Sequence, residues 1–139
     1  MIESNREIKK PSEKREIMPR FEASALRGYC VSVLTASGVE RSCAEAVADA
    51  LIDAELTGVS THGVSRLAVY MQRMDAGVMS RENNIRIVRE STSTLVVDAG
   101  NSLGAAAAKF AMERCIAKAK ETGCCFASVH SSNHFGTAA

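Results

Sequence analysis

The stretch that decides the fold runs as Thr94-Leu-Val-Val97, then the Ala-rich segment Leu103–Thr122, then Cys124-Cys-Phe-Ala-Ser-Val129. The first piece is short and β-branched, which is typical of a strand. The middle piece favours a long helix, and Gly123 is placed to end it. The last piece is an apolar run that we interpret as a buried strand. Strand, long helix and strand together predict a crossover unit within a mixed sheet.

Upstream of this unit the apolar residues recur at helical spacing. The segments 26–34, 47–54 and 67–74 each present an apolar stripe that predicts an amphipathic helix. Ser42-Cys-Ala-Glu45 has the form of a capping box, so we expect Ser42 to cap the second helix and Glu45 to reach back. The third helix is expected to follow the turn around Gly63. Each predicted helix is followed by a glycine that can stop it: Gly38, Gly58 and Gly77.

The chain divides into a flexible charged tail (1–20), a helical region (21–80) and the start of an α/β domain (81–139). The tail carries six basic and four acidic residues, both prolines and no apolar periodicity. Alternation of Ile85 and Ile87 with polar neighbours predicts another strand. The fold class expected is therefore α/β, with helices first and a mixed sheet after them.

Composition excludes several classes of protein. In 139 residues, 46% are hydrophobic and 24% charged, which excludes wholesale disorder. The net charge of +1 gives no electrostatic case for binding nucleic acid or a membrane surface. No apolar run is long enough for a membrane span, and the N-terminus lacks the apolar core of a signal peptide. We expect a cytoplasmic protein.

The five cysteines are odd in number and form no CxxC pair, which argues against a zinc site or a disulfide framework. We expect them to be reduced and structural. Cys124 and Cys125 are interpreted as small hydrophobic residues within an apolar run.

A first candidate site lies in Ser60-Thr-His-Gly-Val-Ser-Arg66 and the residues after it. On a helix that starts near His62, the side chains of His62, Arg66 and Tyr70 share one face. The guanidinium of Arg66 offers a planar fork for a substrate carboxylate. The alternative is a capped helix start with a surface Arg and a core Tyr.

A second candidate site is the polar loop Ser131-Ser-Asn-His-Phe-Gly136, directly after the last predicted strand. The carboxyl ends of strands are the usual place for sites in α/β folds. His134 there titrates near neutrality and suits taking a hydroxyl proton as hydride leaves the same carbon. The alternative is that His134 caps a helix or bonds loop backbone. His130 is interpreted as structural.

The turn Asp98-Ala-Gly-Asn-Ser-Leu-Gly104 links a strand to a helix, as nucleotide-binding loops do. It contains neither GxGxxG nor the lysine of a phosphate loop. Tight turn geometry is expected to explain both Gly100 and Gly104.

Three stretches together resemble the malate/L-lactate dehydrogenase type 2 family of NAD(P)-dependent enzymes: Ala54-Glu-Leu-Thr-Gly-Val-Ser-Thr-His-Gly-Val-Ser-Arg-Leu67 and on to Gly77, Val97-Asp-Ala-Gly-Asn-Ser-Leu-Gly104, and Ser132-Asn-His-Phe-Gly136. The resemblance covers nearly everything from Phe21 onward. It implies an N-terminal helical region joined to a mixed α/β cofactor domain unlike the Rossmann fold. It also implies NAD or NADP as cofactor, a homodimer or larger homo-oligomer, and a small 2-hydroxy or 2-keto acid of the malate, lactate, ureidoglycolate or sulfolactate type.

By position, the resemblance assigns His134 as the general acid or base and His62 as a second catalytic histidine near substrate and nicotinamide. Arg66 is implied to clamp the substrate carboxylate. The family often has Ser where Thr61 stands, a mild departure because both carry a hydroxyl. Residues implied to line the substrate pocket are Thr61, Tyr70 and Asn133.

Family members are far longer chains, so we expect this one to be an N-terminal piece that neither binds NAD(P) nor turns over by itself. Two other interpretations stay open. One is a non-catalytic helical assembly module derived from the family. The other is a metal-binding module that uses His62, His130 and His134 with cysteines.

Overall fold

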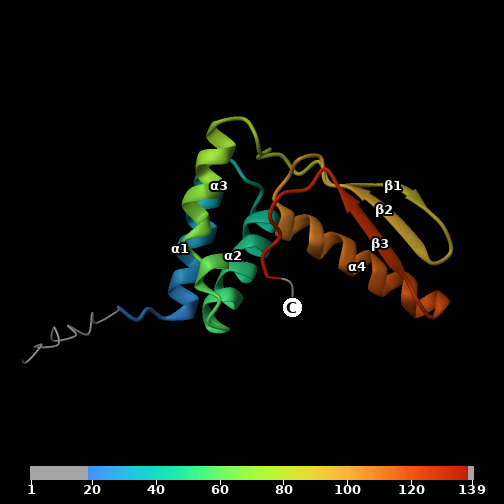
Figure 1. The fold of residues 1–139 in the computed structure, drawn as a ribbon, viewed down its shortest axis with the longest axis horizontal. Helices are drawn as coiled ribbons and strands as arrows, with labels where there is room; N and C mark the ends of the chain where they lie inside the picture. The colour runs from blue at the N-terminus through green and yellow to red at the C-terminus, as the bar shows by residue number, and fades with distance from the viewer. Residues whose placement is uncertain (1–18, 138–139) are drawn as a thin grey trace, which may run out of the picture.

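A computed structural model describes residues 19–137 of the chain. The predicted flexible tail lies, up to residue 18, outside the described residues. Helices group at one end of the molecule, and the sheet with its long helix at the other (Figure 1). In chain order the elements are α1 (Ala23–Ala36), α2 (Arg41–Leu56), the 3-10 turn η1 (Ser60–His62), α3 (Arg66–Asp75), β1 (Arg86–Glu90), β2 (Thr94–Asp98), α4 (Gly104–Thr122) and β3 (Phe126–His130).

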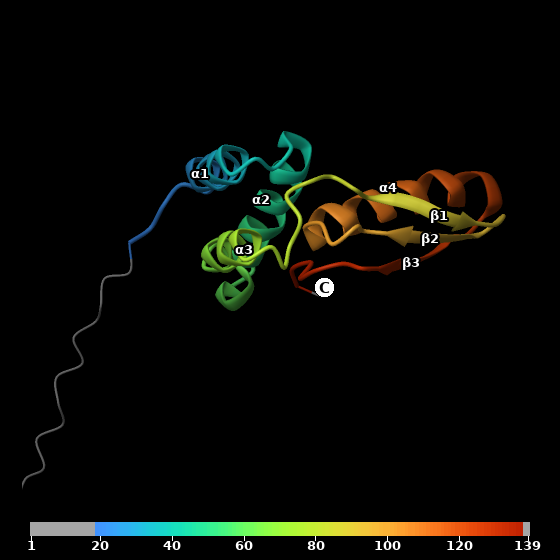
Figure 2. The same ribbon diagram turned by 90° about the horizontal axis from the view of Figure 1, so that it is seen from above.

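The predicted crossover unit and mixed sheet are confirmed. β1 pairs antiparallel with β2, and β2 pairs parallel with β3, with Val97 opposite Val129. Helix α4 makes the connection between the parallel strands and lies along the sheet (Figure 2). Leu95 and Val97 alternate with more exposed residues along β2 and are buried. The carboxyl ends of β2 and β3 therefore meet at the end of the sheet nearest the helices.

The main core lies among α1, α2, α3 and the start of α4. Its largest fully buried side chains include Leu34, Leu51 and Met74, which come from the three predicted apolar stripes. The glycines after these stripes and after α4 have positive φ, as helix-stopping glycines do: Gly38, Gly58, Gly77 and Gly123. In the described part of the chain, no helix combines the length and apolar character needed to cross a bilayer.

The predicted capping box is wrong. Helix α2 begins at Arg41, with Glu40 at the N-cap position and no side-chain cap. Ser42 therefore lies inside the first turn, where its hydroxyl donates to Glu40 Oε1 at 2.6 Å. The carboxylate of Glu45 pairs instead with Arg41 Nε at 2.9 Å, the ordinary i,i+4 ion pair.

Two predictions about the last strand are also wrong. β3 is exposed at all five positions rather than buried, because it lies at one edge of the sheet and no described element covers its outer face. Cys124 is exposed and Cys125 only half-buried, so this pair is not packed as small core residues. Cys30 and Cys43 do have that role, since both lie in the helical core. All five thiols are free.

Candidate functional site

The first candidate segment is not one continuous helix. His62 closes the 3-10 turn η1, and α3 begins four residues later at Arg66. Gly63 between them is extended, with φ −85° and ψ −152°, which interrupts the helical path. The third helix thus follows the turn around Gly63, as expected. The helix start near His62 that would put His62, Arg66 and Tyr70 on one face is wrong, although the turn still returns His62 to the neighbourhood of α3.

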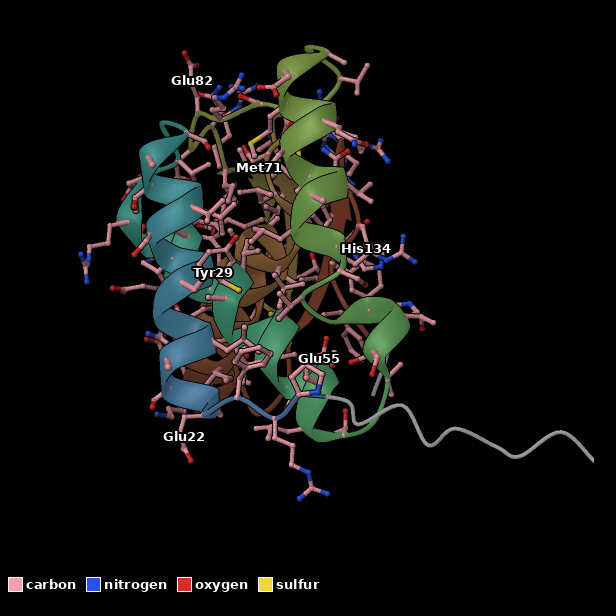
Figure 3. All side chains as sticks on the ribbon, turned by 90° about the vertical axis from the view of Figure 1, so that its left-hand side faces the viewer. Glu22, Tyr29, Glu55, Met71, Glu82 and His134 are labelled. Atoms are coloured by element: carbon pink, nitrogen blue, oxygen red, sulfur yellow. The ribbon has the colours of Figure 1, made fainter. Side chains whose placement is uncertain are left out.

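Three rings from the two candidate segments come together. Tyr70 Oη lies 2.7 Å from His134 Nδ1, a hydrogen bond between residues 64 positions apart. The ring centroid of His62 lies 5.2 Å from that of His134. Figure 3 shows His134 beside α3, with its loop arriving from the end of β3. The structure thus joins the helical segment and the loop after the sheet into one cluster.

The charges around this cluster favour a neutral imidazole. Burial lowers the pKa of His134 below its ordinary value, and Arg66, His62 and Arg73 lower it further. Burial also raises the pKa of Tyr70, so the phenol keeps its proton at neutral pH. The pair can exchange a proton with a ligand without a buried charge at rest.

Arg66 is held by only one of its nitrogens. Its Nε donates to the backbone oxygen of Thr61 at 2.6 Å. Within residues 19–137, its two terminal nitrogens have no protein hydrogen-bond partner. The Thr61 hydroxyl in turn lies 3.0 Å from Nδ1 of His62. A partly anchored guanidinium with free terminal N–H groups can bind a carboxylate.

Asn133 holds the loop that carries His134. Its amide nitrogen donates to Asn101 O at 3.0 Å, Asn101 Oδ1 at 3.0 Å and Ser102 O at 3.1 Å. Its side-chain oxygen Oδ1 accepts a 3.3 Å hydrogen bond from Arg73. Asn133 therefore ties the loop to α3 and to the turn before α4, and contact with a substrate stays a prediction for it.

Sequence reasoning missed several contributors to the site. Arg73 follows Tyr70 by three positions on α3, a spacing that could have identified it. Gly104 is not explained by a tight turn: a Cβ there would lie 2.2 Å from Asn133 O and 2.5 Å from His134 O. Its lack of a side chain lets the site loop cross the start of α4. Gly100, with φ +56°, does fit the turn interpretation.

The alternative metal site is not assembled. No three His, Cys, Asp or Glu side chains of the described segment come together as metal ligands. His130 is apart from the His62–His134 pair, and its Nδ1 lies 3.0 Å from Ser131 Oγ and 3.8 Å from Asp98 Oδ1.

Comparison with known proteins identifies the family. Residues 21–139 match the malate/L-lactate dehydrogenase family. L-sulfolactate dehydrogenase of Methanothermobacter thermautotrophicus is 39% identical over 88% of this chain and 35% of its own. (2R)-3-sulfolactate dehydrogenase (NADP(+)) of Chromohalobacter salexigens is 39% identical over 78% of this chain and 32% of its own.

The solved structure of malate dehydrogenase from Pyrococcus horikoshii superposes with a TM-score of 0.82 at 36% identity, covering 85% of this chain and 34% of that one. The chain thus spans about a third of the length of the curated relatives it matches. With a family match over residues 21–139 and a shared fold, this chain belongs to the malate/L-lactate dehydrogenase family.

Proposed function

We propose that this chain forms the proton-transfer and carboxylate-binding part of an oxidoreductase site that moves hydride between NAD(P) and a small 2-hydroxy or 2-keto acid. The observation that carries the proposal is the 2.7 Å contact of Tyr70 Oη with His134 Nδ1, beside His62 and Arg66, in a chain of this family. Its relatives named above are dehydrogenases of malate and sulfolactate, both of which are 2-hydroxy acids.

His134 is the proton-transfer residue in this proposal. In the oxidation direction its neutral imidazole takes the hydroxyl proton of the 2-hydroxy acid, while the C2 hydrogen leaves with its electron pair and a keto group forms. A donor bond from His134 Nδ1–H to Tyr70 leaves Nε2 with a lone pair for this step. In the reduction direction the same nitrogen returns the proton to the carbonyl oxygen.

The neighbouring residues bind and orient the acid. Arg66 binds its carboxylate through the free terminal nitrogens, which places C2 toward His134. His62, whose ring centroid lies 5.2 Å from that of His134, is proposed as the second catalytic histidine. Thr61, Tyr70 and Asn133 are proposed to line the acid pocket.

When bound, the nicotinamide accepts or donates the hydride. A cavity of about 560 Å³ beside the site loop has the hydroxyls of Ser131 and Ser132 and the apolar side chains of Val129 and Phe135 in its lining. We propose that this cavity takes the nicotinamide end of the cofactor. Among the described residues, its lining includes no lysine or arginine for the pyrophosphate. We therefore propose that the 139 residues alone do not turn over substrate, and that NAD or NADP binding needs further protein.

We further propose that the working enzyme is a cytoplasmic homodimer or larger homo-oligomer. The proposed cofactor is NAD or NADP, and one relative carries NADP(+) in its name. The substrate class is a 2-hydroxy acid with at least one carboxylate, because Arg66 offers one free fork.

A chimera tests the proposal. Residues 21–137 would replace the matching third of the Pyrococcus horikoshii enzyme, and oxidation of NADH and NADPH would be followed with a panel of 2-keto acids. We expect the chimera to oxidise NADH or NADPH when a 2-keto acid is present, and the 139-residue protein not to do so. The 139-residue protein should also leave the fluorescence of NADH unchanged at micromolar concentrations. A folded chimera that binds NADH but reduces no 2-keto acid would contradict the proposal and favour an assembly module.

A further inference from the structure

A carboxylate on helix α2 anchors the loop that carries His62, in addition to the backbone bond from Val59 N–H to Ala54 O at 2.8 Å. Glu55, in the last turn of α2, accepts a hydrogen bond from the Val64 backbone N–H on Oε1 at 2.8 Å. The bond is partly buried and joins residues nine positions apart. Figure 3 labels Glu55 near the end of α2, on the same side of the molecule as the loop.

Gly63 makes room for this carboxylate. A Cβ at Gly63 would lie 2.0 Å from Glu55 Oε1 and 2.8 Å from Glu55 Cγ. The backbone of Gly63 has an ordinary negative φ of −85°, so its conformation does not itself require glycine. The side chain of Glu55 therefore occupies the space in which any other residue at position 63 would place its Cβ.

The anchored amide stands midway between two residues of the proposed site. His62 lies two positions before Val64, and Arg66 lies two positions after it. The Arg66 backbone N–H donates to Gly63 O at 2.9 Å, and the Arg66 side chain donates to Thr61 O at 2.6 Å. Fixing Val64 therefore fixes the short hydrogen-bonded segment on which both His62 and Arg66 are placed.

We infer that Glu55 is a positioning residue for the site, acting through the Val64 amide to hold His62 and Arg66 against His134, with Gly63 as the matching gap. The inference rests on the proposed function for its catalytic meaning. Glu55 does not act on the substrate. What matters is the acceptor atom Oε1 rather than the negative charge, so Gln at this position should serve and Ala should not.

The test uses the 139-residue protein and needs neither substrate nor cofactor, so its outcome is separable from that of the proposed function. The groups that face His134 are His62, Arg66, Tyr70 and Arg73. NMR titration of the His134 ring should give a midpoint below that of an ordinary histidine in the parent. In Glu55→Ala the midpoint should rise toward the ordinary value, because Arg66 and His62 are no longer held nearby.

Amide hydrogen exchange supplies a second readout. Exchange at Val64 should speed up about tenfold or more in Glu55→Ala, as expected for loss of a hydrogen bond to a charged acceptor. Glu55→Gln should keep both parent values. Asp53→Ala is the matched control, because Asp53 is an exposed carboxylate of the same helix and its side chain has no hydrogen bond among the described residues.

Gly63→Ala disturbs the same contact between Glu55 and the Val64 amide by placing a methyl group where the carboxylate lies. Alone, it should reproduce the Glu55→Ala results, because its methyl group displaces the carboxylate. In the Glu55→Ala background it should add nothing, since the space is then free. The inference is overturned if Glu55→Ala leaves the His134 midpoint and Val64 exchange unchanged. Full additivity of the two substitutions would overturn it as well, and Gly63→Ala decides the matter should Glu55→Ala fail to fold.

Discussion

The helices α1 to α3 bury the largest side chains of their apolar stripes, whereas β3 and the outer face of α4 leave large apolar side chains exposed. In the helices, Leu34, Leu51 and Met74 are at most 1% exposed. In the second unit, Phe126 is 71% exposed, and on α4 Met112 is 61% exposed. The two sets are alike in hydrophobicity, so the difference lies in their neighbours. Burial follows from what packs against a stripe, and the sequence of the stripe does not determine it.

The candidate site spans the boundary between these two regions. Tyr70 belongs to the closed helical core, while His134 follows the exposed edge strand β3. The buried helical region should therefore hold Tyr70 in a fixed position, and Tyr70 in turn should position His134 on the exposed side. Each prediction below tests one side of this contrast.

The largest effect is expected on the open side, at His134. In the chimera, His134→Ala should lower kcat by about 10²- to 10⁴-fold, the usual contribution of a general acid or base. Lys120→Ala is the control, since Lys120 is exposed in the last turn of α4. A kcat within about threefold of the parent at neutral pH would remove His134 from the mechanism.

Stability should separate the two regions directly. Leu51→Ala, at a site 1% exposed, should lower the free energy of unfolding by about 2–5 kcal/mol. Phe126→Ala, at a site 71% exposed, should change it by less than about 0.5 kcal/mol. The same Phe126→Ala should reduce self-association in light scattering, because exposed apolar patches and strand edges recruit partners. If urea unfolding showed that Leu51→Ala and Phe126→Ala lower the free energy of unfolding equally, the contrast between the two regions would be contradicted.

On the closed side, Arg66→Lys keeps the charge and loses the planar fork. In the chimera, kcat/KM for the 2-keto acid should fall about 10- to 150-fold, which corresponds to a charge-assisted contact of about 1.5–3 kcal/mol. Arg41→Lys on α2, an exposed arginine paired with Glu45, is the control. An unchanged kcat/KM in Arg66→Lys would mean that another residue binds the carboxylate.

The smallest effect concerns the charge of Arg73. Burial is the first cause that lowers the pKa of His134, and Arg73 contributes least, so Arg73→Gln should raise that pKa only slightly. Because the protonated imidazole cannot act as base, the acid limb of the oxidation profile should move to higher pH by the same amount. NMR titration of the His134 ring measures the shift, with Arg41→Gln as control. A shift to lower pH would contradict the assigned sign.

Much of the fold could be predicted because the relevant signals are local. The stop glycines have the left-handed backbone that the pattern required, and the β-branched run at Thr94 became β2. The buried state of β3 could not be predicted, since apolar sequence is compatible with burial but does not supply the covering element. The start of α2 was misplaced because the pattern of Ser42 and Glu45 also fits positions inside a first turn, and Glu40 stands at the N-cap position.

The site residues came from two local motifs and a family resemblance, and the structure brings His62, Tyr70 and His134 together. Periodicity alone could not do so, because the Tyr70–His134 contact spans 64 positions. Glu55 was missed for a related reason. Its partner is a backbone amide, which leaves no trace in side-chain spacing.

The absent side chain at position 104 makes the first residue of α4 a natural adjustment point for protein engineering. Carbonyl oxygens of Asn133 and His134 occupy the volume that a methyl group would need there. A graded series of Ala, Ser and Val at this position would act as a wedge of increasing size beneath the loop. It would displace the His134 backbone while every side chain of the site kept its identity. The position of the His134 imidazole could then be varied stepwise while its chemistry stays the same.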